Sequence, residues 1–467
     1  MQVSVASTPH LRRVGSVLAI ASVAAILFAT LLPDSGQPVN SQFCLVCGPR
    51  GGVDAILNVL LFVPLGVGLA LSGLQWNRVV MTACAISLMV ETAQFFFIPG
   101  RDATLGDVLT NTIGGALGFA VARNAPIWVR PRPRTATILG LGWCAVWLVI
   151  QAISSFSFAP SIPDSGYYGQ IARQLGGFAL FPGKVLDPKI GDVAITDKRF
   201  NDIDSVGRRL LDGAKVALTA VSAGRTNDIA PIVRVADDQQ REIVLVAQDK
   251  DAFLFGVRTG SAVFRLRSAL FAMPGVFADG VGQTKASPGE PLTLSASFDG
   301  VEAQLTARGR SVSRHQTIAV SSALGWTLAL PFQWYIENTR TEMVVSWIWM
   351  ACLTAPIGFW GVYTPRVTDP RRRLLIAVLC FLAGLAILIA GLVRVRYAIG
   401  LPAAPLRDWI AAMSGVVAGG ALAFRVGDVL RKREPSALGS GPRRGDVIVV
   451  GAVARAAGGL SFNSKLR

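Results

Sequence analysis

Histidine is almost absent from this chain: two occur among 467 residues, and neither lies inside a long apolar segment. The sequence also lacks the G-x-S-x-G turn of serine hydrolases, the H-E-x-x-H metal motif and a phosphate-binding glycine loop. No recognisable nucleic-acid-binding module accompanies the net charge of +16. These absences argue against common hydrolase and metalloenzyme classes, against a nucleic-acid partner and against a bound cofactor.

Cysteine is also scarce, and its positions leave little room for metal or redox chemistry. Four of the six cysteines lie in apolar stretches, where a thiol usually packs as a small apolar group: Cys84, Cys144, Cys352 and Cys380. Cys44 and Cys47 form a C-x-x-C, but no second pair or nearby histidine completes a zinc site. A thioredoxin-like role would need a βαβ context that is missing here. Cys44 and Cys47 therefore remain a disulfide candidate if their compartment is oxidising.

Charged residues make up only 16% of the chain, whereas 52% is hydrophobic and the mean hydropathy is +0.49. This balance predicts a polytopic membrane protein. Windows of about 20 apolar residues predict eight helical spans, the first of which is interpreted as a retained helix and not a cleaved signal sequence. They lie near 13–32, 53–73, 79–98, 104–122, 135–153, 342–363, 374–393 and 404–425.

Basic residues gather in the loops that follow the fourth and sixth predicted spans. By the positive-inside rule, these loops and both termini lie in the cytoplasm, and the chain lies in the cell (inner) membrane beside anionic lipid. Arg394, Arg396 and Arg407 break this rule because they fall in a short outer segment. We interpret that exception as a sign of a functional role.

Between the fifth and sixth spans, long apolar runs give way to short alternating stretches, which predicts an extracytoplasmic all-β domain. Besides a hairpin, strands are expected at 232–235, 242–247, 253–258 and 262–267. The fold class is therefore a polytopic α-helical membrane protein with an all-β, jelly-roll-like soluble insert. Four regions follow: a five-span membrane domain (1–156), the β domain (157–338), a three-span membrane block (339–430) and a basic cytoplasmic tail (431–467).

The clearest element of the β domain is a hairpin around an Asp-Gly pair at 299–300. Residues 292–298 and 301–308 alternate between apolar and polar side chains, which is a strong signal for a two-residue turn. Phe298 and Val301 are expected to pair on the buried face. The extended run, the return strand and the following glycine resemble the laminin G or concanavalin A-like fold. Three roles stay open for it: structural spacing or partner docking, glycan binding, and glycoside hydrolysis.

The most informative feature is a set of polar residues inside or beside the second, third and fourth spans. A charged group inside a bilayer costs about 2.5–3.5 kcal/mol on insertion scales, so it rarely persists without a partner or a purpose. The predicted topology brings the outer ends of these spans together. We therefore predict one polar site near the outer surface, formed by Asp54, Asn58, Glu91, Gln94, Arg101, Asp102, Asp107 and Asn111. Glycines at 114, 115 and 118 are expected to let the fourth span pack closely against a neighbour.

The spacing of these residues is Asp54-x3-Asn58-x3-Phe62-x-Pro64-x-Gly66, then Glu91-x2-Gln94-x6-Arg101, then Asp107-x3-Asn111-Thr112-x-Gly114. Over about 70 residues this pattern closely resembles the VanZ-like membrane domain. The family is named for a member associated with low-level resistance to the glycopeptide teicoplanin, so the resemblance implies its membrane architecture and a cell-envelope setting. Some members carry a histidine near the position of Asn58, and its absence here argues against histidine-dependent chemistry.

Three hypotheses follow from these residues. In the first, Glu91, Arg101 and Asp107 form a buried network that only fixes helix packing. In the second, Arg101 with Arg394 or Arg396 grips an anionic headgroup while amide side chains bond a sugar or peptide. The protein would then bind or sense a lipid-linked glycan, a polysaccharide or a lipoglycopeptide. In the third, Glu91 and Asp107 act as catalytic acid and base on a lipid-linked substrate. Binding is favoured over catalysis because the catalytic motifs are missing, and transport fits less well because the polar groups avoid the midplane.

A weaker repeat lies near the end of the chain. Asp408, Gly415 and Gly419 repeat the spacing of the aspartate and two glycines of the fourth span. The last two spans are therefore either a copy of the third and fourth spans or a chance coincidence of glycines. Because no amide replaces Asn111 and no carboxylate replaces Glu91, a copy is expected to be structural and not active.

Overall fold

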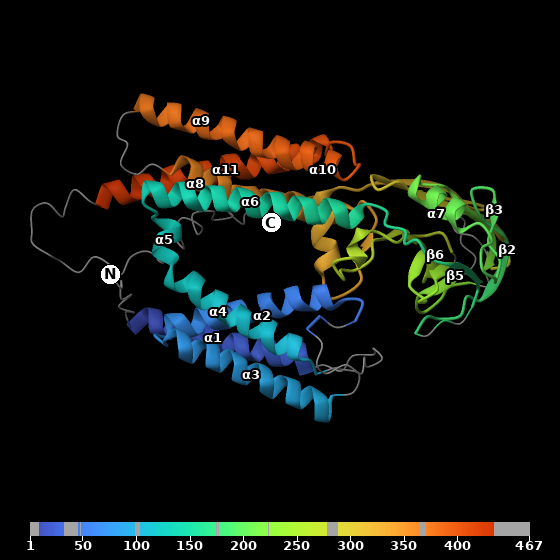
Figure 1. The fold of residues 1–467 in the computed structure, drawn as a ribbon, viewed down its shortest axis with the longest axis horizontal. Helices are drawn as coiled ribbons and strands as arrows, with labels where there is room; N and C mark the ends of the chain where they lie inside the picture. The colour runs from blue at the N-terminus through green and yellow to red at the C-terminus, as the bar shows by residue number, and fades with distance from the viewer. Residues whose placement is uncertain are drawn as a thin grey trace, which may run out of the picture. The chain divides into compact units, whose positions relative to one another are not determined.

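Figure 1 shows the computed structural model, which describes residues 9–31, 45–46, 48–98, 103–173, 175, 177–222, 224–277, 288–363 and 370–433. Contacts divide the chain into two compact units. The first unit joins Met1–Gly140 with Trp360–Leu374 and Ala421–Arg467. The second unit joins Leu141–Phe359 with Leu375–Gly420.

Eight of the described helical segments are long and apolar enough to cross a membrane, which is the number predicted from the sequence. They contain α1 (Pro9–Leu31), α2 (Gly51–Leu71), α3 (Trp76–Phe97), α4 (Leu105–Arg123), α6 (Pro133–Phe158), α8 (Arg340–Val362), α9 (Pro370–Ile389) and α11 (Leu406–Arg433). The α9 segment continues through the π-helical turn η3 (Ala390–Arg394) into α10 (Val395–Ala398). The short α5 (Ala125–Val129), which follows α4, was not predicted. The chain is a multi-pass membrane protein.

Helices α1 to α4 pack closely because glycines line their contacts. A Cβ atom on Gly66 of α2 would lie 2.0 Å from the carbonyl oxygen of Gly115 in α4, and one on Gly118 would lie 2.1 Å from that of Val63. Backbones approach this closely only where a side chain is missing. The predicted close packing of the fourth span is therefore confirmed, with α2 as its neighbour. Apolar side chains form the adjoining core: Ala19, Ile26, Phe62, Leu65, Ala83 and Val90.

The strands of the second unit form two six-stranded sheets. The first sheet has the order β1 (Tyr167–Ile171), β5 (Ala230–Asp237), β6 (Glu242–Asp249), β7 (Ala252–Val257), β8 (Leu270–Met273) and β12 (Tyr335–Ile336). The second has the order β11 (Ser313–Ala319), β10 (Glu302–Arg308), β9 (Pro291–Phe298), β4 (Val216–Ser222), β2 (Gly183–Ile190) and β3 (Val193–Ala194). Neighbouring strands are antiparallel except β8 and β12, which are parallel.

The two sheets share one hydrophobic core. In β4, alternate residues are buried, as expected for a strand with one face inside. The ring of Phe271 in the first sheet lies 4.8 Å, between centroids, from that of Phe298 in the second. The short helix α7 (Ile203–Leu211) adds Val206 and Leu210 to the same core. The β-rich character predicted for this region is therefore confirmed.

The hairpin predicted around the Asp-Gly pair is present, but its turn differs from the prediction. Strands β9 and β10 pair in antiparallel fashion, and Phe298 pairs with Ala303 and not with Val301. Gly300 has a φ of 89°, whereas the φ of Asp299 is not positive. The Oδ1 atom of Asp299 instead accepts hydrogen bonds from two following backbone N–H groups. The aspartate side chain thus stabilises a longer loop, which moves the pairing by two residues.

Of the four other predicted strands, three are confirmed as β5, β6 and β7. The strand predicted at 262–267 is wrong, because a 3-10 turn, η1 (Gly260–Ala262), opens this stretch and further turns follow. Phe264 packs against Phe156 of α6, with ring centroids 5.7 Å apart. A contact with a helix therefore overrides the alternating pattern of this segment.

Helices of the second unit form a core of their own beside the strands. Residues of α6, α8, α11 and the α9 segment contribute to it: Trp147, Met350, Leu353, Leu388, Leu392, Ala411 and Ala412. Trp143 of α6 also donates its Nε1–H to the carbonyl oxygen of Leu353 over 2.7 Å. The second 3-10 segment, η2 (Ser322–Ala329), adds Ala323 from the β-rich part of the chain. Within this unit, the strands and the helices are therefore joined by packed side chains.

Candidate functional site

A short hydrogen bond joins α2 to α4 at the predicted polar site. Asn58 Nδ2 donates to Asp107 Oδ1 over 2.6 Å. Asp107 lies in the first turn of α4, where Thr104 Oγ1 accepts a hydrogen bond from its backbone N–H at 3.1 Å. A carboxylate in the first turn also interacts favourably with the positive end of the helix dipole. Asn58 and Asp107 thus fix the start of α4 against α2.

Glu91 and Asn111 join α3 to α4. Glu91 is buried, and its Oε2 accepts a hydrogen bond from the backbone N–H of Thr104 at 2.9 Å. Asn111 is also buried and donates from Nδ2 to Ser87 Oγ over 2.9 Å. Its Oδ1 has no hydrogen-bond partner among the residues that the structure describes. The two candidate catalytic carboxylates, Glu91 and Asp107, therefore contact different partners, and both position the start of α4.

The remaining predicted site residues differ in what the structure shows of them. Gln94 Nε2 donates to the carbonyl oxygen of Thr30 in α1 over 2.9 Å. Asp54 is exposed in the first turn of α2. Four residues lie outside the described ranges: Arg101, Asp102, Cys44 and Cys47. The described part of the predicted site is therefore a set of contacts that hold α1 to α4 together.

Helices α8 and α11 repeat the packing of α2 and α4. The glycines at the contacts are Gly66, Gly114 and Gly118 in the first pair, and Gly358, Gly415 and Gly419 in the second. The carbonyl oxygens that an added Cβ would meet belong to Gly115, Val59 and Val63 in the first pair, and to Val416, Ala351 and Ala355 in the second. The spacing along each helix is the same, and a proline lies two residues before the first glycine of each pair. The repeat seen in the sequence is therefore a repeat in packing, and it includes α8.

The two helix pairs differ in their polar side chains. When the glycines of the two helix pairs are aligned, Asp408 is equivalent to Asp107, and Met350 is equivalent to Asn58. Met350 is fully buried in the apolar core of the second unit. A thioether is at most a weak acceptor and donates no hydrogen bond. The second pair therefore keeps the carboxylate and lacks the amide that donates to it in the first pair.

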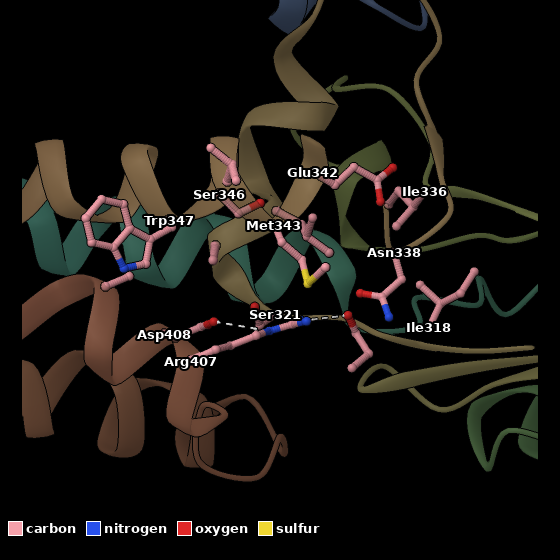
Figure 2. A pocket seen from close by; sticks show the side chains of 15 residues that line it. Ile318, Ser321, Ile336, Asn338, Glu342, Met343, Ser346, Trp347, Arg407 and Asp408 are labelled. Carbon is pink, nitrogen blue, oxygen red and sulfur yellow. Dashed lines mark hydrogen bonds and ion pairs between the residues drawn. The ribbon is translucent and has the colours of Figure 1, made fainter. Parts of the chain in front are cut away.

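A cavity of about 310 Å³ lies against Asp408 (Figure 2). Its walls come from the end of β11 and the segment that follows, from β12, and from the first two turns of α8 and α11. Most of the lining is apolar, with Ile318, Leu324, Ile336, Met343, Val344 and Trp347. Polar groups come from Ser321, Asn338, Glu342, Ser346 and Arg407. The cavity is therefore amphipathic, and its charged lining groups are the carboxylates of Glu342 and Asp408 and the guanidinium of Arg407.

The two carboxylate oxygens of Asp408 differ in the partners that the described residues give them. Its side chain is 2% exposed, and its Oδ1 lies 3.6 Å from Arg407 Nε. Arg407 Nη2 also donates to the carbonyl oxygen of Ala319 over 2.8 Å. Asp408 Oδ2 and Ser321 Oγ are buried, and neither makes a hydrogen bond of standard geometry in the described part of the chain, although the Ser321 hydroxyl lies close enough to Asp408 to interact with its carboxylate.

Arg396 adds a buried positive charge within electrostatic reach of Asp408. Its side chain is fully buried, and its Nε donates to the carbonyl oxygen of Pro402 over 2.7 Å. Sequence reasoning identified Arg396 and Arg407 as exceptions to the positive-inside rule and proposed Arg396 as a partner of Arg101 at an anionic headgroup, but it missed the cavity. The available signal was Asp408 in an apolar segment, with methionine in the place of the amide that would pair with it.

A second hollow, of about 290 Å³, lies on the second sheet and is lined by polar side chains. They are Lys215, Thr293, Ser295, Ser297, Gln304, Thr306, Arg308 and His315. Alternate residues of β9 and β10 share this face, and the strand register places Thr306 beside both Ser295 and His315. His315 Nδ1 lies 3.0 Å from Thr306 Oγ1. Within the described ranges, no group of His, Cys, Asp and Glu is arranged to hold a metal ion.

Residues 9–128, which contain α1 to α4, match the model of the family VanZ/LLP1. No curated protein and no solved structure matches the chain. The matched segment holds the close glycine contacts between α2 and α4 and the hydrogen bond from Asn58 to Asp107. Residues 9–128 thus form a VanZ-like domain within a multi-pass membrane protein that also carries a two-sheet β region.

Proposed function

We propose that this protein is a cell-envelope membrane protein that binds a lipid-linked glycan or lipoglycopeptide at the extracytoplasmic face of the cell membrane. The VanZ-like domain provides the membrane setting. The β region, which we interpret as concanavalin A-like or laminin G-like, contacts the saccharide. The observation that carries this proposal is the polar hollow on the second sheet.

The hollow presents the groups that recognise sugar hydroxyls. Serine and threonine hydroxyls both donate and accept hydrogen bonds, and the amide of Gln304 does the same. Thr293, Ser295 and Ser297 place three such hydroxyls along one strand. A volume of about 290 Å³ is near the lower end of the range of small-molecule sites, about 300–1,000 Å³. These features support a short saccharide segment as the ligand.

The charge of the hollow favours an anionic glycan. Lys215 and Arg308 both line it, and none of the described residues that line it is a carboxylate. The planar guanidinium of arginine matches carboxylate and phosphate groups in two-pronged geometry. A glycan that carries carboxylate or phosphate groups should therefore bind more tightly than an uncharged one.

The contacts inside the VanZ-like domain favour binding over catalysis. Glu91 and Asp107 each make a hydrogen bond that positions the start of α4. A catalytic acid or base must instead reach the proton that it transfers on the substrate. We propose that this protein lowers the sensitivity of the cell to glycopeptides by binding the lipid-linked molecule that they target.

The test is calorimetric titration of the full-length protein in detergent with carboxylated, phosphorylated and uncharged oligosaccharides. We expect Arg308→Gln to weaken binding of the charged ligands about tenfold, the effect of one charge-assisted hydrogen bond. Thr306→Val should weaken all three classes. Arg310→Gln is the matched control, because Arg310 is exposed just beyond β10 and does not line the hollow. Unchanged binding by both Arg308→Gln and Thr306→Val would contradict the proposal.

A further inference from the structure

The cavity beside Asp408 has the features of a second binding site, separate from the polar hollow on the sheet. Buried polar atoms are almost always paired, and leaving one unpaired costs about 1–3 kcal/mol, or more when it is charged. Asp107 shows how the equivalent carboxylate is paired, through the amide of Asn58. Asp408 Oδ2 has no such amide donor among the described residues; the Ser321 hydroxyl is the weaker group beside it, and Asp408 lines an open volume of about 310 Å³. A ligand that donates a hydrogen bond would supply a partner for the carboxylate of Asp408.

The position of the cavity points to a ligand from the membrane. Its walls include the first turns of α8 and α11, two of the membrane-crossing segments. Met343, Val344 and Trp347 line it and are 44%, 56% and 46% exposed. Apolar side chains exposed at the end of a membrane helix face lipid, and tryptophan is typical of the interface between bilayer and water. The cavity therefore opens at the level of lipid headgroups.

The charges around the cavity favour a ligand with no net charge. Asp408 and Glu342 line it with negative charge, while Arg407 lines it and Arg396 lies nearby with positive charge. Glu342 already accepts hydrogen bonds from Trp334 Nε1, at 2.8 Å, and from backbone N–H groups. Asp408 is thus the carboxylate left to accept from a ligand. A zwitterion can place its cation there and its anion beside Arg407.

We propose that this cavity binds the headgroup of an aminophospholipid. Its ammonium group donates to Asp408 Oδ2, its phosphate lies beside Arg407, and the start of its chains lies along Val344 and Trp347. The volume of about 310 Å³ accommodates a headgroup and leaves the remaining chains in the bilayer. The ammonium group takes the place that the amide of Asn58 holds in the first helix pair.

The test is native mass spectrometry of the full-length protein in detergent with phosphatidylethanolamine and phosphatidylcholine in equal amounts. The two lipids carry the same charges, but only the first has N–H groups that can donate to Asp408. We expect phosphatidylethanolamine to be retained at least about tenfold more, as one charge-assisted hydrogen bond implies. Asp408→Asn should remove this preference. Asp212→Asn, which changes an exposed carboxylate outside the cavity, should keep it.

A second variant separates loss of the site from loss of the fold. Ala411 lines the cavity and is buried, so Ala411→Leu should reduce retention of both lipids while helical circular dichroism and saccharide binding stay unchanged. Equal retention of the two lipids by the wild-type protein would overturn the proposal. So would an unchanged preference in folded Asp408→Asn, or, in a separate competition of phosphatidylethanolamine with phosphatidylglycerol, preferential retention of phosphatidylglycerol, whose headgroup donates through hydroxyls. Saccharide binding is measured separately, so either proposal can fail without the other.

Discussion

The helix pair α2 and α4 and the helix pair α8 and α11 have the same backbone contacts and different polar chemistry. Both pairs approach through three glycines and begin their second helix with an aspartate. Asp107 accepts from Asn58, whereas Asp408 faces a cavity and Met350 occupies the matching position. The comparison teaches that the glycines determine how the helices pack. The residue opposite the aspartate then determines whether its carboxylate is used inside the protein or left for a ligand.

The largest effect is expected at the glycines, where the two pairs agree. Gly118→Ala and Gly419→Ala place a Cβ atom 2.1 and 1.8 Å from a backbone carbonyl oxygen. Each should lower the free energy of unfolding by about 3 kcal/mol, because the backbones must separate. Thermal unfolding in detergent, followed by circular dichroism, measures this effect. Gly427→Ala is the control in α11, since an added Cβ there meets no described atom within 4 Å. Equal stability of all three variants would refute the shared packing.

A smaller effect is expected where the pairs differ. Asn58→Leu removes the donor to Asp107, so it should destabilise the protein by about 1.5–3 kcal/mol, the range for hydrogen bonds to charged groups. Met350→Leu removes a weak thioether acceptor of Gln151 Nε2 but keeps an apolar side chain of similar volume, so it should cost less than about 1.5 kcal/mol. The same unfolding measurement compares the two. If Met350→Leu were the more damaging change, the assigned equivalence of the two positions would be wrong.

The smallest effect is expected at a buried carboxylate that already has its donors. Asp237 is fully buried in the β region, and burial alone would raise its pKa. Hydrogen bonds from Arg241 Nε at 2.6 Å and from the backbone N–H groups of Arg241 and Gln239 instead hold the pKa below its usual value. The stability that this carboxylate contributes is therefore fully present above the pKa of an aspartate in the unfolded chain, about 3.9. It is lost as the pH falls through the pKa of Asp237 in the folded protein.

Because the pKa of Asp237 is lowered in the folded protein, its contribution can be tested by acid titration. Wild-type protein should lose stability below about pH 4, and Asp237→Asn should flatten that part of the curve. The β-sheet signal in circular dichroism, followed against temperature at each pH, measures both proteins. Parallel curves for the two would show that the hydrogen bonds to Asp237 do not stabilise its charged form.

The helical part of the fold could be predicted because it depends on local patterns. Apolar runs of about 20 residues predicted eight spans, and the glycine spacing at 114, 115 and 118 predicted close packing. The Asp-Gly pair also predicted the position of the hairpin. Its pairing could not be predicted, because Asp299 stabilises a longer loop with its side chain.

The candidate sites were less predictable because they depend on contacts between distant segments. The hydrogen bonds of Asn58, Glu91 and Asn111 follow from how the helices are arranged. The residue spacing suggested that these side chains lie close together, but it could not identify the partner of each one. The cavity beside Asp408 combines residues of β11, α8 and α11, and these elements do not follow one another directly in the sequence. The polar hollow could have been inferred from the polar half of the alternation in β9 and β10, once their register was known.

The most direct test of the comparison is Met350→Asn, measured in the lipid competition between phosphatidylethanolamine and phosphatidylcholine. This substitution gives α8 the amide that Asn58 provides in α2. We predict that the new amide donates to Asp408, and that the preference for phosphatidylethanolamine falls about tenfold while the protein stays folded. If a folded Met350→Asn protein kept the full preference, Asp408 would not be the group that accepts the hydrogen bond from the lipid ammonium group.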